Sequence, residues 1–154
     1  MLTGSQVVLE MDVRSQASMS YACHNFIENY AATEWVPAFV DAFPDVKNAM
    51  ARKYILHFCI GRHDDYPPIL AMARLALSDR SWLVRSDAMA ILAYALDQES
   101  LALIKPLLGH KDERTRLAAA GATKAIMQKN RNYFANIEGR AVWIAPSSSI
   151  DSQL

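Results

Sequence analysis

Two stretches of this sequence decide its fold: VRSDAMAIL at residues 84–92 and TRLAAAGAT at residues 115–123. Each has an arginine at its second position, Arg85 or Arg116, followed by small or aliphatic residues at helical spacing. The offset between the two stretches is 31, and the same offset places LALSD at residues 75–79 over PLLGH at residues 106–110. Repetition at a fixed period of roughly 20–50 residues is typical of stacked units that bury their apolar faces against one another. The sequence therefore predicts a row of repeated helical hairpins.

A third copy of the repeat is predicted nearer the N-terminus, at an offset of 38 from the copy that contains Arg85. In this register Lys47 matches Arg85, and Pro37 matches Pro106. Two prolines at one repeat position support the register, because a proline within a helix usually has a fixed structural reason. The predicted helices cover residues 21–42 and 45–60, 67–78 and 82–97, and 99–109 and 112–129.

Residues that begin and end helices lie at these boundaries. Gly61 and Gly109 each follow an apolar run, and a glycine there adopts the left-handed conformation that ends a helix at little cost. The adjacent prolines Pro67 and Pro68 favour the first turn of a helix. The predicted N-cap residues are Asp64 or Asp65, Ser81 and Asp112.

The repeated pattern resembles the HEAT repeat, including its short PBS-lyase-type form, over about residues 35–128. In that family an aliphatic pair and an aspartate precede a Val-Arg pair, two spaced alanines and a further aliphatic residue. The resemblance implies an all-α fold, a short α-solenoid of about three helical hairpins. The residues that carry it are Leu77, Asp79, Val84, Arg85, Ala88, Ile91 and Leu92, then Leu107, Leu108, Asp112, Arg116, Ala119 and Ala122, and more weakly Asp41, Val46 and Lys47.

A basic residue recurs at one position of the repeat, as Lys47, Arg85 and Arg116. A fixed repeat position favours a role in stacking, so we expect each of them to pair with an acid near the preceding turn, such as Asp79 or Asp112. Replacing Arg85 is then expected to lower stability before it affects binding.

The two ends differ from the repeats and are predicted to form irregular or short-strand caps. Apolar and polar residues alternate over residues 7–14, which favours a strand, although the Leu, Glu and Met content also permits a helix. Residues 140–145 are predicted to form a strand or to pack over the last helix pair. The predicted domain covers residues 1–145, and residues 146–154 are predicted to be a flexible tail.

Composition excludes several classes of protein. The 154 residues suffice for one domain, and the formal net charge is zero, which argues against a polybasic protein. The charge is unevenly spread, with −4 over residues 1–50, +1 over residues 51–110 and +3 over residues 111–154. The sequence has only two cysteines, no apolar run of transmembrane length and no signal-peptide core, so we expect a cytoplasmic protein.

Candidate catalytic and metal-binding groups are few. Cys23 next to His24, and His57 two residues before Cys59, cannot chelate from one helix, because such neighbours point about 100° and 200° apart. The cluster of residues 63–65 is interpreted as an exposed loop before a helix rather than an acid–base pair. We therefore expect no metal, no cofactor and no enzymatic activity.

The surface left for function is the outward side of the second helix in each hairpin, which lines the concave face in HEAT-like proteins. Tyr94 is the strongest candidate anchor, because a large amphipathic side chain with few torsions is typical of binding hot spots. Trp35 and Trp82 are interpreted as local packing. The predicted partner-binding residues are Asn48, Arg52, Ser86, Asp87, Tyr94, Leu117, Lys124 and Gln128.

Three functional hypotheses follow. A stand-alone chain of this size with three HEAT-like units resembles the small bacterial immunity proteins that bind and occlude a cognate toxin, and the acidic first third suits a basic nuclease. The alternative is nucleic-acid binding or repair, by resemblance to HEAT-like alkyl-base DNA glycosylases. A bilin-lyase-like role has no chromophore cysteine pattern to support it. The basic residues that motivate the nucleic-acid alternative are Lys111, Arg114, Lys124, Lys129, Arg131 and Arg140.

Overall fold

The structure is a computed structural model that describes residues 2–12 and 16–131. In these residues all regular secondary structure is helical and no strand is present, so the prediction of an all-α fold is confirmed. The α-helices are α1 (Gly4–Met11), α2 (Gln16–Asn29), α3 (Ala32–Ala42), α4 (Ala49–Cys59), α5 (Pro68–Ala76), α6 (Trp82–Ala95), α7 (Leu101–Ile104) and α8 (Glu113–Met127). Three short 3-10 helices connect them: η1 (Phe43–Asp45), η2 (Gln98–Ser100) and η3 (Lys105–Gly109).

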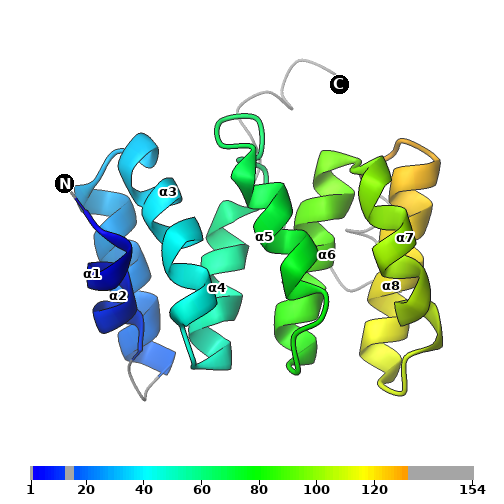
Figure 1. Ribbon diagram of the computed structural model, residues 1–154, viewed down its shortest axis with the longest axis horizontal. Helices are drawn as coiled ribbons and strands as arrows, with labels where there is room; N and C mark the ends of the chain where they lie inside the picture. The colour runs from blue at the N-terminus through cyan, green and yellow to red at the C-terminus, as the bar shows by residue number, and fades with distance from the viewer. Residues whose placement is uncertain (1, 13–15, 132–154) are drawn as a thin grey trace.

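The helices form two layers in a row of pairs (Figure 1). α2, α4, α6 and α8 pack in sequence in one layer, while α1, α3 and α5 pack in sequence in the other. The longest apolar run of the core is in α6, which contacts α4, α5 and α8 and is buried on nearly all sides from Val84 to Tyr94. Small residues at Ala88, Ala119 and Ala122, all fully buried, let α6 and α8 pack closely.

The N-terminal segment is a helix, so for the described part of residues 7–14 the favoured strand is wrong and the helix that the composition also permitted is present. Thr3 and Gln6 form a capping box, in which Gln6 N–H donates to Thr3 Oγ1 at 3.3 Å and Thr3 N–H donates to Gln6 Oε1 at 2.8 Å. Val7 and Met11 lie one helical turn apart and are fully buried, which accounts for the apolar pattern. Residues 140–145 and the predicted tail lie outside the described residues.

The single helix predicted over residues 21–42 is two helices. The chain breaks at Ala31, whose backbone is extended, and α3 starts there because the Glu34 carboxylate accepts the Ala31 N–H at 3.1 Å. The break creates an additional pair, α1 with α2, ahead of the first predicted hairpin. The described chain therefore holds four helix pairs where about three were predicted.

The N-caps of α4, α6 and α8 also correct the predicted repeat register. α4, α6 and α8 begin after Asn48, Ser81 and Asp112, so the offsets between successive copies are 33 and then 31. The predicted offset of 31 is confirmed and that of 38 is wrong. Pro37 lies inside α3 and Pro106 lies in the second position of η3, so the two prolines are not equivalent.

The predicted helix ends are only partly correct. Gly61 has φ +80° just after α4, as expected, but Gly109 does not have a positive φ. α6 ends instead on a left-handed leucine, Leu96, at φ 54°. The segment predicted as a helix over residues 99–109 is mostly 3-10, and its α-helical part is only α7, Leu101–Ile104.

The predicted N-caps are also only partly correct. The Asp112 carboxylate accepts the N–H groups of Arg114 and Thr115, as predicted. The Ser81 side chain makes no such bond, and α5 starts after Pro67 with no side-chain cap, so the predicted capping by Ser81 and by Asp64 or Asp65 is wrong. Pro67 already has helical backbone angles, so the turn continues directly into α5.

Candidate binding surfaces

In each of the helices α4, α6 and α8, one arginine at the same place binds the turn that precedes the helix. The guanidinium of Arg85 donates from Nη1 to the carbonyl oxygens of Asp79 at 2.6 Å and Arg80 at 3.0 Å. Each arginine follows its N-cap residue by four positions and binds the carbonyls five and six positions before it. The two equivalents are Arg52, which binds the carbonyls of Val46 at 3.1 Å and Lys47 at 2.6 Å, and Arg116, which binds those of His110 at 2.8 Å and Lys111 at 3.0 Å.

The first two arginines of this series also reach the next unit. Arg52 makes a bidentate ion pair with Asp79, at 2.7 Å from Nε and 3.0 Å from Nη2. Arg85 donates to the Thr115 hydroxyl from Nη2 at 2.9 Å and from Nε at 3.2 Å. The series is therefore Arg52, Arg85 and Arg116, and the prediction that Lys47 belongs to it is wrong. The partners of these three arginines are mainly backbone carbonyls and one hydroxyl, and only Arg52 pairs with an acid that was predicted as a partner.

These contacts lower the pKa of the Asp79 carboxyl group. Burial raises its pKa, but hydrogen bonds from Arg52 and from the Ser81 amide outweigh that desolvation, and the pKa lies below its ordinary value. A depressed pKa means that the carboxylate stabilises the fold above the unfolded-state pKa and loses this effect as the pH falls through the folded-state pKa.

We therefore expect the stability difference between the wild type and Asp79→Asn to shrink as the pH falls below the unfolded-state pKa of about 3.9. The free energy of unfolding from urea titrations across that range measures it, and Asp65→Asn, at an exposed position, serves as the control. A difference that is as large in acid as at neutral pH would contradict the role assigned to the Arg52–Asp79 pair.

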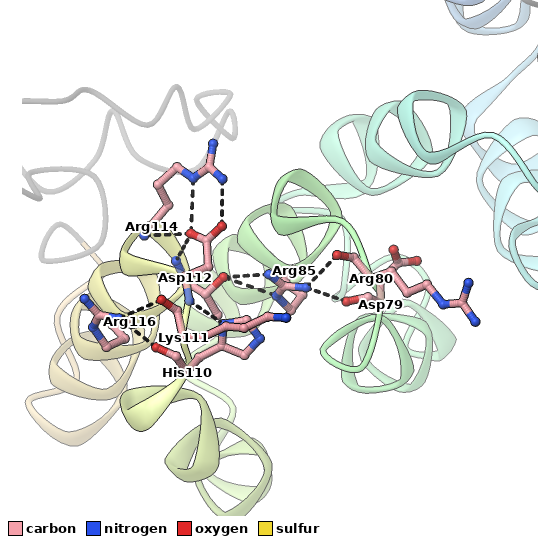
Figure 2. A network of polar contacts seen from close by, with 9 residues as sticks. Asp79, Arg80, Arg85, His110, Lys111, Asp112, Arg114 and Arg116 are labelled. Atoms are coloured by element: carbon pink, nitrogen blue, oxygen red, sulfur yellow. Dashed lines mark hydrogen bonds and ion pairs between the residues drawn. The ribbon is translucent and has the colours of Figure 1, made fainter.

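A cleft of about 530 Å³ opens between the turn before α6 and the turn before α8 (Figure 2). The Arg114 guanidinium lies over the Trp82 ring at 4.2 Å from its centroid and pairs with the Asp112 carboxylate at 2.6 Å. This hydrogen bond holds the pKa of Asp112 well below its usual range. The lining residues of this basic cleft are Asp79, Arg80, Ser81, Trp82, Arg85, His110, Lys111, Asp112 and Arg114.

The predicted partner-binding residues do not form one exposed strip. Asn48 is the N-cap of α4, and its side chain accepts the N–H groups of Met50 and Ala51. Arg52 is engaged as described above, and Asp87 is 8% exposed, with Oδ2 at 3.8 Å from Lys53 Nζ. Ser86 and Leu117 are partly buried, whereas Lys124 and Gln128 are exposed on α8 and its C-cap.

Tyr94, the predicted anchor, is 2% exposed, so the prediction that it stands outward is wrong. Its ring lies edge-on to His63 at 6.1 Å and under the Arg131 guanidinium at 4.9 Å. The backbone of Gly61 approaches the same ring. The interpretation of Trp35 and Trp82 as local packing agrees with the structure. Trp35 is buried beneath Arg62, and Trp82 is partly covered by Arg114.

The acidic character of the first third of the chain was visible in the charge pattern and was matched to a basic nuclease, but none of its carboxylates was among the predicted partner-binding residues. All six carboxylates of the segment 1–50 are exposed. Two large apolar side chains in the same segment of the chain are also strongly exposed, Leu9 on α1 at 77% and Tyr21 on α2 at 76%. The residues of this acidic end are Glu10, Asp12, Glu28, Glu34, Asp41 and Asp45.

The two cysteines are buried. Cys23 Sγ contacts Met11 Sδ at 3.3 Å, and Cys59 is fully enclosed. Burial raises the pKa of each thiol to about 12, so neither is a thiolate at neutral pH. Within the described ranges no group of three or more His, Cys, Asp or Glu side chains is placed to hold a metal ion.

No protein-family model, no curated protein and no solved structure matches this chain. The HEAT-repeat resemblance therefore stays a prediction. In the part of the chain that the structure describes, no helix combines the length and apolar character needed to cross a membrane.

Proposed function

We propose that this chain is a non-enzymatic protein-binding module, a short HEAT-like α-solenoid that docks a basic protein on its acidic end. The observation that carries the proposal is the combination of six exposed carboxylates with two large exposed apolar side chains on and beside α1–α3. An apolar anchor within a charged rim is typical of protein interfaces. Opposite charges on the chain and on its partner would accelerate their encounter.

The proposed biological role is that of an immunity protein. A nuclease toxin has a basic face where it binds its substrate, and an acidic protein that covers this face blocks access without chemistry. Leu9 and Tyr21 would supply apolar contact, and the surrounding carboxylates would orient the partner.

The prediction concerns three charge reversals at the acidic end. Glu10→Lys, Glu28→Lys and Asp41→Lys together should lower retention of a basic partner at least about tenfold, because attraction becomes repulsion. The measurement is affinity capture from the native source with the full chain as bait, followed by titration of the captured protein. One molar equivalent of the wild type should also suppress the toxic activity of that protein.

The matched control reverses three other exposed carboxylates, Asp64→Lys, Asp65→Lys and Glu113→Lys. It has the same change in net charge, so any general effect of charge appears equally in both variants. Equal loss of the partner in the two variants would contradict docking at the acidic end. Failure to capture a stoichiometric basic protein with the wild type would contradict the function itself.

A further inference from the structure

The basic cleft has an excess of positive charge that the fold does not use. Four cationic and two carboxylate side chains line it, which leaves a net charge of +2. Both carboxylates are already paired, Asp79 with Arg52 and Asp112 with Arg114. Arg80 and Lys111 are exposed, and neither side chain makes a hydrogen bond or ion pair with the residues that the structure describes.

These two cations lie at equivalent places on neighbouring turns. Arg80 directly precedes the N-cap of α6, and Lys111 directly precedes the N-cap of α8. The two helices pack against each other, and their preceding turns lie along the same edge of the molecule, at the bottom of Figure 1. Packed helices are about 8–10 Å apart, so the two charges flank the cleft at a spacing that one extended polyanion can contact.

The cleft also offers a flat surface, formed by Trp82 and Arg114. Trp82 is partly exposed, and the Arg114 guanidinium lies over its ring while Asp112 holds that guanidinium from the side (Figure 2 shows the Asp112–Arg114 contact). Planar aromatic and guanidinium groups stack with nucleic-acid bases of any sequence. A volume of about 530 Å³ exceeds what a single phosphate group fills.

We propose that the basic cleft binds single-stranded nucleic acid without sequence preference. Arg80 and Lys111 contact successive backbone phosphates, and the Trp82–Arg114 pair contacts a base. An acidic peptide would satisfy the cations but would have no use for the planar pair, so the combination favours a nucleic acid. The site is separate from the acidic end and does not depend on the function proposed there.

The test uses the full chain and a fluorescently labelled oligothymidylate. With two phosphate contacts, binding should weaken about sevenfold between about 50 and about 200 mM salt, because each contact on a single strand contributes a slope of about −0.7. Arg80→Gln with Lys111→Gln should weaken binding at low salt at least about tenfold and flatten the slope. The melting temperature should not change, because both side chains are exposed.

The matched control is Lys47→Gln with Lys105→Gln, which removes two exposed cations outside the cleft and should leave binding nearly unchanged. Binding of the oligonucleotide should quench the fluorescence of Trp82. The variant Trp82→Phe should lose this contribution to the quenching. Equal weakening in the control pair would overturn the site, as would absence of binding at low salt. If polyglutamate competes as effectively as unlabelled oligonucleotide, the cleft does not select nucleic acid. That result would overturn the proposal in favour of an acidic protein as the ligand.

Discussion

Replacing Arg85 with alanine should lower the free energy of unfolding by about 3 kcal/mol, a fall in melting temperature of about 6–12 °C for a domain of this size. Arg85 is 5% exposed, and its guanidinium satisfies the Asp79 and Arg80 carbonyls. The Thr115 hydroxyl, which is also buried, loses its donor in the variant. Buried acceptors without a donor pay the full desolvation penalty, so the loss exceeds that of an ordinary hydrogen bond.

The equivalent change at Arg116 supplies the control. Arg116 binds the same two types of carbonyl, but it is exposed, and water can replace it. We expect Arg116→Ala to lower the free energy of unfolding by less than about 1 kcal/mol. Thermal and urea unfolding of both variants decide the matter, and equal losses would mean that the contact of Arg85 with the next unit contributes little.

This pair of arginines also shows how much of the repeat register could be predicted from the sequence. The offset of 31 between Arg85 and Arg116 was predicted correctly because the flanking residues match closely. The first unit was misplaced because two basic residues, Lys47 and Arg52, lie near the start of α4. Only the geometry of the turn distinguishes them, since the repeat position is the one whose guanidinium reaches back to the carbonyls of its own turn.

The binding surface was harder to predict than the fold. Tyr94 was chosen because its helical position differs from that of the repeat's apolar residues, but α6 is covered on nearly every side. The sequence does carry the signal for the acidic end, as a charge of −4 over residues 1–50. It also carries Thr3 and Gln6 at capping-box spacing, which outweighs the alternating pattern that favoured a strand.

Replacing Gly61 with alanine should lower the free energy of unfolding by about 2 kcal/mol and the melting temperature by about 4–8 °C. Gly61 has φ +80°, where a side chain with a Cβ is strained. An added Cβ would also lie 3.3 Å from the Tyr94 ring, which is buried and flanked by His63 and Arg131, so it has little room to move. Differential scanning calorimetry at neutral pH measures the shift.

Gly109 is the matched control for this substitution, because the sequence predicted the same left-handed cap at both glycines. Its φ is not positive, and nothing lies within 4 Å of an added Cβ. An alanine there reduces the conformational freedom of the unfolded chain without strain in the folded one, so Gly109→Ala should raise the stability by about 0.4–1 kcal/mol. The two glycines should therefore respond with opposite sign, and a loss of stability at Gly109, or none at Gly61, would contradict the backbone conformations on which the turn before α5 and the end of η3 depend.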